Sequence, residues 1–104
     1  MTRSKYRAIP VVIDGHRFAS KAEGRRYTEL RLLEQAGEID NLELQPRFDL
    51  IVAGIDVGTY VADFRYLSPA GVVIEDVKGV RTPVYKLKKR LVRALHGVEI
   101  VEVP

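Results

Sequence analysis

Along the chain, the spacing of hydrophobic residues changes from the two-residue period of strands to the longer period of helices. Residues 9–18 place short apolar runs on both sides of Asp14-Gly15, a turn pair that favours a β-hairpin. Ser20 then offers a helix N-cap, and the residues from there to Ala36 are mostly helix formers. Gly37 is typical of a helix end. We therefore expect a hairpin followed directly by a helix.

Three segments with strand-like composition follow the predicted helix, at residues 43–52, 57–67 and 72–78. Ala53-Gly54 separates the first segment from the second, and residues 68–71 (Ser-Pro-Ala-Gly) separate the second from the third. Both are strong turn signals, and short turns between successive strands favour antiparallel neighbours. We expect these strands to form an antiparallel meander.

A second helix and a last strand complete the pattern. Thr82 can act as the N-cap, Pro83 suits the first helical position, and Gly97 would end the helix. Four apolar residues at helical spacing predict its buried stripe: Val84, Leu87, Leu91 and Leu95. The alternating residues 98–103 predict a strand beside the others. The order helix, three strands, helix, strand predicts an α/β or α+β fold with a mixed sheet flanked by helices.

The composition fits one globular domain spanning residues 1–104, because 46% of the residues are hydrophobic and 30% are charged. The chain has no cysteine, which excludes disulfides and thiolate metal sites. No long apolar stretch follows the first residues, so we expect neither a signal peptide nor a membrane span. We therefore expect a soluble cytoplasmic protein. The net charge of +3 is compatible with a polyanionic partner. Basic residues gather in residues 81–93 and in residues 1–8, a basic arm that we expect to be flexible.

The segment of residues 72–79 places two carboxylates and a lysine within four residues of an otherwise apolar predicted strand. Because strand side chains alternate, Asp76 and Lys78 share one face and Glu75 points to the other. A hairpin would bring Asp63, the one acid of the preceding predicted strand, level with Asp76. Two carboxylates at one point bind Mg²⁺ together with waters and substrate oxygens, and a lysine beside them can hold an attacking water. The competing interpretation is a structural ion pair between Asp63 and Lys78.

This arrangement resembles a known nuclease motif. Asp63, twelve intervening residues and then Asp76-Val77-Lys78 resemble the motif of the PD-(D/E)XK nuclease superfamily, with Ala62 in place of the motif's proline and an aspartate in place of the commoner glutamate. The expected order of helices and strands also resembles the core of that superfamily. Four segments are similar to a small phage-encoded branch that resembles Holliday-junction resolvases, and this similarity spans about residues 5–103. They are Phe18–Glu23, Leu42–Phe48, Tyr60–Phe64 and Glu75–Gly79.

The resemblance implies a restriction-endonuclease-like αβββαβ core and a role for each acid. Asp63, Asp76 and Glu23 would bind Mg²⁺, with Mn²⁺ as a substitute, and would form the catalytic group together with Lys78. Glu23 has a competing role, because residues 20–23 also form a capping box in which Glu23 reaches back to the backbone N–H of residue 20. Both roles of Glu23 stay open at the level of sequence.

Basic residues that follow the lysine are candidates for nucleic-acid contact. Arg81, Lys86 and Lys89 lie before or on the cationic side of the second predicted helix. Cations that neutralise phosphates give binding that weakens steeply with salt. Gln45 interrupts a strand-like run, and the resemblance makes it a further candidate for substrate contact, although an exposed strand glutamine explains it equally well.

The leading hypothesis is a Mg²⁺-dependent endonuclease that hydrolyses phosphodiester bonds in DNA, including branched recombination or replication intermediates. Symmetric cutting of a junction would need a homodimer, and a phage-encoded enzyme would act in the cytoplasm of the bacterial host cell. Two other classes stay open: a nucleic-acid-binding module that kept the fold and lost cleavage, and a protein-interaction domain whose acids form surface salt bridges. Loss of hydrolysis with retained binding on Asp76→Asn distinguishes the enzyme from the module.

Overall fold

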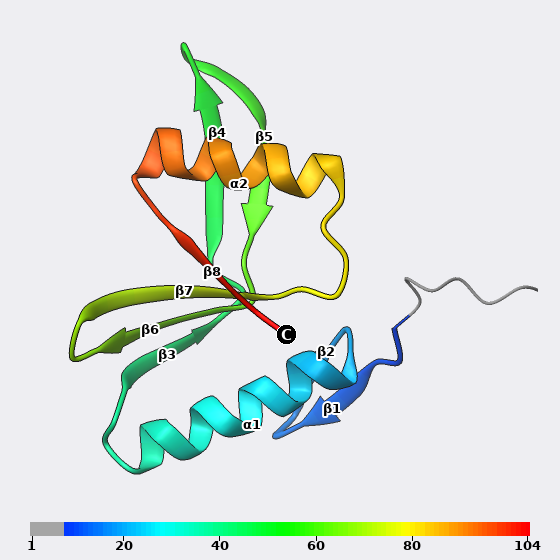
Figure 1. Ribbon diagram of the computed structural model, residues 1–104, viewed down its shortest axis with the longest axis vertical. Helices are drawn as coiled ribbons and strands as arrows, with labels where there is room; N and C mark the ends of the chain where they lie inside the picture. Colours follow the sequence, from blue (N-terminus) through cyan, green and yellow to red (C-terminus); the bar gives the residue numbers. More distant parts are fainter. Residues whose placement is uncertain (1–7) are drawn as a thin grey trace, which may run out of the picture.

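The N-terminal part of the described chain is a small hairpin. The computed structural model describes residues 8–104, and β1 (Val11–Ile13) pairs antiparallel with β2 (His16–Phe18) (Figure 1). Asp14 and Gly15 have φ angles of 53° and 77°, as a left-handed two-residue turn requires, so the predicted hairpin is confirmed. Residues 1–7 of the predicted basic arm lie outside the described part of the chain.

The first helix, α1 (Lys21–Gln35), packs against this hairpin and against the sheet. The Ser20 hydroxyl caps the helix by accepting a hydrogen bond from the Glu23 N–H at 3.1 Å. Gly24 lets the hairpin approach closely, because a Cβ there would lie 2.6 Å from a methyl carbon of Val11. The hairpin therefore covers the first turns of α1, which carry Glu23.

A mixed sheet of four strands lies between the two helices, in the order β3, β6, β7, β8 (Figure 1). These strands are β3 (Asp40–Leu44), β6 (Phe64–Ser68), β7 (Gly71–Val77) and β8 (Ile100–Val103). β6 runs antiparallel to both of its neighbours, and β8 joins β7 in parallel after a crossover through the second helix. The parallel pair puts the ends of β7 and β8 side by side, with Asp76 opposite Glu102.

A second, separate hairpin of β4 (Arg47–Val52) and β5 (Ile55–Val61) projects beyond the sheet (Figure 1). The prediction of three long strands is therefore wrong in its bounds, because the first predicted strand divides into β3 and β4 and the second into β5 and β6. The chain bends at Gln45, whose φ of 53° is left-handed, and again just before β6. Across the bends, the Gln45 N–H donates to the Asp63 carbonyl at 3.0 Å. The predicted antiparallel order of these segments is confirmed.

The second helix, α2 (Pro83–His96), begins and ends where the sequence predicts. The Thr82 hydroxyl caps it by accepting a backbone hydrogen bond at 3.1 Å, and Gly97 follows it in the left-handed conformation. α2 lies across the hairpin of β4 and β5 (Figure 1). Within residues 8–104, neither helix is long and apolar enough to cross a membrane.

The predicted buried stripe of α2 is wrong at three of its four positions, and only Leu91 packs against the core. Val84 and Leu87 are 62% and 50% exposed, whereas the residues that the helix buries are Tyr85 and Val92. The helix is rotated about its axis relative to the prediction. This rotation brings the Tyr85 hydroxyl to Glu102 on β8, where the two are hydrogen-bonded at 2.6 Å.

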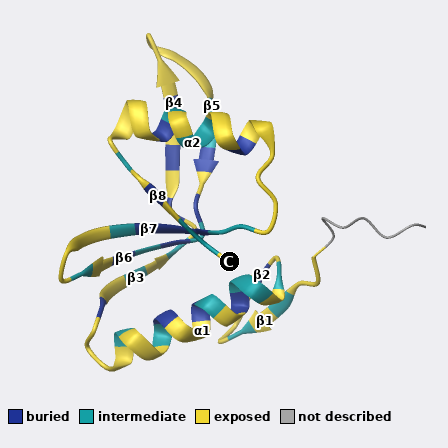
Figure 2. Ribbon diagram, viewed as in Figure 1, coloured by how far each residue is buried: buried dark blue, intermediate teal, exposed yellow. Residues whose placement is uncertain are grey.

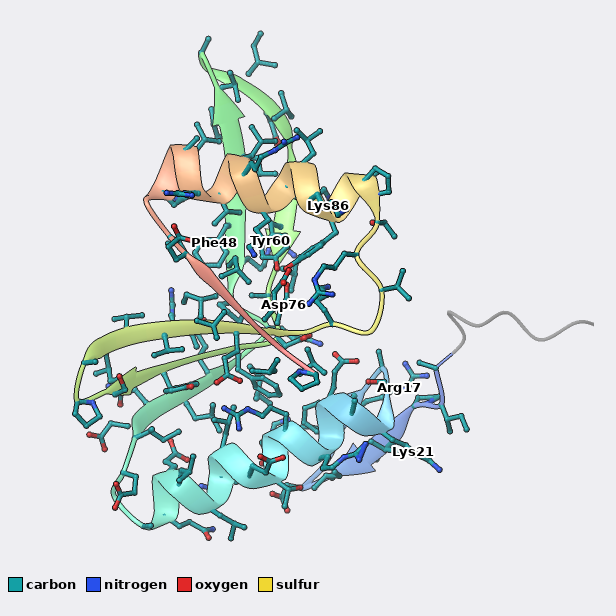
Figure 3. All side chains as sticks on the ribbon, viewed as in Figure 1. Arg17, Lys21, Phe48, Tyr60, Asp76 and Lys86 are labelled. Atoms are coloured by element: carbon teal, nitrogen blue, oxygen red, sulfur yellow. The ribbon has the colours of Figure 1, made fainter. Side chains whose placement is uncertain are left out.

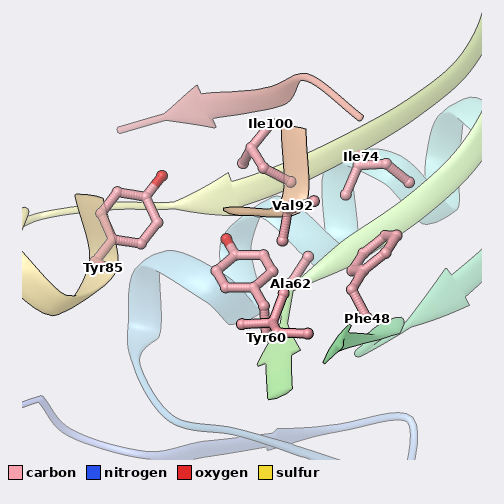
Figure 4. Close-up of a cluster of buried hydrophobic side chains, with 8 residues drawn as sticks. Phe48, Tyr60, Ala62, Ile74, Tyr85, Val92 and Ile100 are labelled. Carbon is pink, nitrogen blue, oxygen red and sulfur yellow. The ribbon is translucent and has the colours of Figure 1, made fainter. Parts of the chain in front are cut away.

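Two hydrophobic clusters pack on opposite faces of the four-stranded sheet (Figure 2). The first lies among the sheet, α2 and the hairpin of β4 and β5 (Figure 4), and its buried members are Phe48, Leu50, Tyr60, Ala62, Ile74, Tyr85, Val92 and Ile100. The second lies between the sheet and α1, and its buried members are Phe18, Tyr27, Leu30, Ile39, Phe64 and Tyr66. Because side chains alternate along β7, Ile74 and Asp76 face the first cluster and Glu75 faces the second.

Candidate functional site

The bend between β5 and β6 places Asp63 beside the end of β7. The Asp63 N–H donates to the Glu75 carbonyl at 3.1 Å, and the Asp63 Oδ2 accepts a hydrogen bond from the Val77 N–H at 2.7 Å. These bonds fix both the backbone and the carboxylate of Asp63 against β7. The structure thus brings Asp63 to the strand end that carries Asp76 and Lys78.

Asp76 is almost fully buried, at 1% exposure, and its Oδ2 has no hydrogen-bond partner within residues 8–104. The Lys78 Nζ lies 3.7 Å from that oxygen, as an ion pair longer than a hydrogen bond. Burial raises the pKa of Asp76 to about 6, against the opposing effect of the Lys78 charge. The competing interpretation, an ion pair between Asp63 and Lys78, is wrong in its partner, because Lys78 pairs with Asp76.

Glu23 reaches the same place from the first turn of α1. Burial, followed by a hydrogen bond with the Glu23 carboxyl group, raises the pKa of Asp63 to about 7. Glu23 also takes part in the helix cap, but its Oε2 contacts the Ser20 hydroxyl at 3.0 Å rather than the Ser20 backbone N–H that the capping box predicts. Glu23 therefore contacts both the cap and Asp63.

The acids fit a hard divalent cation whose shell is completed by water and phosphate oxygens. In the part of the chain that the structure describes, no three histidine, aspartate or glutamate side chains form a ready metal cage. Mg²⁺, however, takes one or two protein carboxylates and keeps several waters. A cation would satisfy the unpartnered oxygen of Asp76 and would favour the charged forms of Asp76 and Asp63, which burial disfavours. Asp63 and Asp76 therefore fit Mg²⁺ as protein ligands, with Glu23 beside them.

An aromatic ring holds Lys78 in addition to Asp76. The Lys78 Nζ lies 4.3 Å from the centroid of the Tyr85 ring, a cation–π contact. The hydroxyl of this tyrosine donates to Glu102 Oε2 at 2.6 Å, and Arg81 Nε donates to Glu102 Oε1 at 2.8 Å. These two hydrogen bonds lower the pKa of Glu102 to about 2. No spacing in the sequence indicates this arrangement, because only the parallel pairing of β8 with β7 brings Glu102 to the site.

Glu75 is a second buried acid, on the opposite face of the same strand as the alternation predicts. It accepts hydrogen bonds from Arg26 Nε at 2.8 Å, from Arg26 Nη2 at 2.6 Å and from the Tyr66 hydroxyl. The bond to Glu75 is the largest effect that raises the pKa of Arg26, while burial and then Glu75 raise the pKa of Tyr66 to about 12. Glu75 is thus a satisfied charge that ties α1 to β7, one residue from Asp76.

The predicted nucleic-acid contacts have different surroundings. Arg81 and Lys89 both pair with Glu102, at 2.8 Å and 3.4 Å, whereas Lys86 is exposed and forms no ion pair within residues 8–104. All three line a cleft of about 420 Å³ along the side of α2 that faces β8. Gln45 is exposed, and its backbone rather than its side chain is bonded to Asp63.

Without a cation, the folded chain is expected to be less stable at pH 8 than at pH 5. The pKa values of Asp63 and Asp76 are raised to about 7 and about 6, so the folded state keeps protons that the unfolded state loses near pH 4. Folding therefore takes up protons between about pH 4 and about pH 7, and the stability of the folded chain falls as the pH rises through this range. The lowered pKa of Glu102 affects stability only at lower pH. Thermal unfolding in EDTA at pH 5 and at pH 8 measures the difference in stability. If the double variant Asp63→Asn/Asp76→Asn kept the full difference, Asp63 and Asp76 would not be the groups that cause it.

The comparisons with known proteins identify a family and nothing narrower. Residues 3–100 match the family model described as "Protein of unknown function (DUF1064)". No curated protein and no solved structure matches the chain. The matched range includes all four candidate residues, from Glu23 in α1 to Lys78 after β7. Because the match covers nearly the whole sequence, the chain belongs to the DUF1064 family.

Proposed function

We propose that this protein is a metal-dependent endonuclease that hydrolyses phosphodiester bonds in DNA. The observation that carries the proposal is the meeting of Asp63, Asp76 and Lys78 at one strand end, where two desolvated carboxyl groups and an ammonium adjoin Glu23 of α1. Perturbed acids that converge with a lysine are typical of catalytic sites. In this proposal the α+β fold is a restriction-endonuclease-like core, in agreement with the resemblance of the motif to PD-(D/E)XK nucleases.

Each residue of the site has a role that follows from its surroundings. A bound Mg²⁺ supplies Lewis-acid chemistry at the scissile phosphate. Asp63 and Asp76 hold it, and Asp63 is itself fixed by the Val77 N–H. Lys78 orients the attacking water and offsets the negative charge that develops on the phosphate. The Tyr85 ring and Asp76 keep its ammonium in place.

DNA is the proposed partner because a cationic surface adjoins the acidic strand end. The cleft between α2 and β8 is lined by two glutamates, which pair with three of its basic side chains, and by five basic side chains in all: Arg81, Lys86, Lys89, Arg90 and Arg93. Figure 3 shows Lys86 on the side of α2 that faces Asp76. Contacts of this kind bind phosphates and carry no base specificity. Branched DNA, including four-way junctions, is the substrate class that the resemblance adds.

The proposal is tested by incubating the purified chain with labelled linear, flapped and four-way DNA in Mg²⁺, in Mn²⁺ and in EDTA. We expect cutting with either metal and none in EDTA. Lys78→Ala should lower the cleavage rate by a factor of about 100 to 1,000, as loss of one transition-state donor does in other enzymes. Lys88→Ala is the matched control, because Lys88 donates to the Thr59 carbonyl and should leave the rate nearly unchanged.

A nucleic-acid-binding module is the second candidate, and the basic side chains of the cleft along α2 favour it, because they would bind DNA phosphates without a metal. Binding of DNA without cutting in any metal would select this module over the enzyme. A chain that bound neither Mg²⁺ nor DNA would exclude both candidates and leave a protein-interaction domain.

A further inference from the structure

Tyr60 carries a buried hydroxyl that has no hydrogen-bond partner in the described part of the chain. The side chain is 5% exposed, and its oxygen makes no hydrogen bond within residues 8–104. Most buried hydroxyls are hydrogen-bonded, because burial without a bond costs free energy. Phenylalanine would fill the same space without that cost. The hydroxyl therefore needs an explanation that packing does not provide.

The surroundings of Tyr60 connect it to the candidate site. Its ring packs against the Tyr85 ring, with centroids 6.3 Å apart, and Tyr85 lies under the Lys78 ammonium. Figure 4 shows the Tyr60 hydroxyl on the side of the cluster where Tyr85 lies, and Tyr60 belongs to the same cluster as Ile74, which shares its face of β7 with Asp76. Asp76 Oδ2 is the other buried side-chain oxygen without a hydrogen bond in the described residues.

The two unpartnered oxygens have complementary chemistry. The Tyr60 hydroxyl is a donor, and the Asp76 carboxylate is an acceptor and a ligand for cations. The two groups are not bonded to each other. A third oxygen between them, from a water that accompanies the cation or from the phosphodiester, would satisfy the tyrosine while the cation satisfies the acid.

We propose that Tyr60 is a further binding residue of the site, whose hydroxyl donates a hydrogen bond to an oxygen ligand held at Asp76. The inference rests on the proposed function, because it takes Asp76 as a cation ligand. It adds a donor that neither the motif nor the spacing of the acids identifies. The unpartnered hydroxyl is thus a preformed part of the loaded site.

The test compares Tyr60→Phe with Tyr85→Phe, which removes the same atom from a neighbouring ring but breaks a bond to Glu102. In EDTA, Tyr60→Phe should unfold at the same temperature as the unmodified chain or higher, whereas Tyr85→Phe should unfold lower. Titration calorimetry with Mg²⁺ alone, and DNA binding in Mg²⁺ in a Lys78→Ala background, then locate the ligand oxygen. Tyr60→Phe should weaken one of these affinities about tenfold, as loss of a hydrogen bond at a charged site does.

Each result decides the inference. Weaker Mg²⁺ binding without DNA assigns the hydroxyl to a water, and weaker binding only with DNA assigns it to the phosphodiester. Unchanged affinities, or a loss of stability in EDTA equal to that of Tyr85→Phe, would overturn it. If the unmodified chain binds Mg²⁺ but cuts no DNA, the proposed function fails while the Mg²⁺ titration still decides the role of Tyr60. If it binds neither, both fail.

Discussion

Replacing Glu75 by alanine is expected to lower the free energy of unfolding by about 3–5 kcal/mol, the usual effect of breaking a buried ion pair from one side. Glu75 is 1% exposed and accepts hydrogen bonds from two guanidinium nitrogens of Arg26, Nε and Nη2, and from the Tyr66 hydroxyl. Its removal leaves the Tyr66 hydroxyl without its acceptor and leaves the partly buried guanidinium of Arg26 with only the exposed Glu29 as an ion-pair partner. Urea or thermal unfolding measures the loss.

The chain offers a matched control on the same sheet. Glu43 and Arg65 are joined at 2.6 Å, as close as Arg26 and Glu75, but both side chains are more than 40% exposed. Glu43→Ala should therefore cost less than about 1 kcal/mol. Removing both charges of the pair, as Arg26→Met/Glu75→Leu, should restore much of the lost stability. Equal losses for the single variants at Glu75 and Glu43 would show that burial does not set the strength of the first pair.

The position of this ion pair explains why it matters to the site. Arg26 lies one helical turn after Glu23, and Glu75 directly precedes Asp76. The pair therefore fixes α1 on β7 at the level where Glu23 meets Asp63. A buried pair is weak evidence for stability by itself, but here it sets the register between two elements that both carry candidate ligands.

Those parts of the fold that depend on neighbouring residues could be predicted from the sequence. The Asp14-Gly15 turn and the caps at Ser20, Thr82 and Gly97 lie where the sequence predicts them, because each acts within a few residues. The bend at Gln45 was not predicted, although Pro46 interrupts the same segment and cannot donate a hydrogen bond to a sheet; the left-handed backbone of Gln45 itself has no local signal. The same holds for the rotation of α2, which tertiary contacts of its tyrosine decide.

In the candidate site, too, local features could be predicted from the sequence and contacts between distant elements could not. Alternation along one strand correctly separated Asp76 and Lys78 from Glu75. The partners of these residues come from other elements, Arg26 from α1 and Glu102 from β8, and no spacing in the sequence relates them. The metal and the reaction stay predictions, because the structure supplies the arrangement of the acids and not their ligand.

Asp76→Asn is expected to lower metal-dependent cleavage by a factor of at least about 1,000, the rate equivalent of several kcal/mol of metal-derived stabilisation. Asparagine has nearly the same shape but no charge, so it weakens a Mg²⁺ ligand and removes the partner of Lys78. Burial disfavours the charged form of Asp76, so the variant should be at least as stable as the unmodified chain at pH 8 in EDTA. Cleavage, Mg²⁺ titration and thermal unfolding are measured on the same preparation.

The matched control is Asp49→Asn, at an exposed acid on β4, which should change neither cleavage nor Mg²⁺ affinity. DNA binding in EDTA should persist in Asp76→Asn, because the cationic cleft along α2 is unchanged. Cleavage that survives in this variant would exclude Asp76 as the ligand. Loss of cleavage together with a lower unfolding temperature would instead assign Asp76 a structural role. Only a stable, DNA-binding and inactive variant with weakened Mg²⁺ affinity agrees with a catalytic metal held at this strand end.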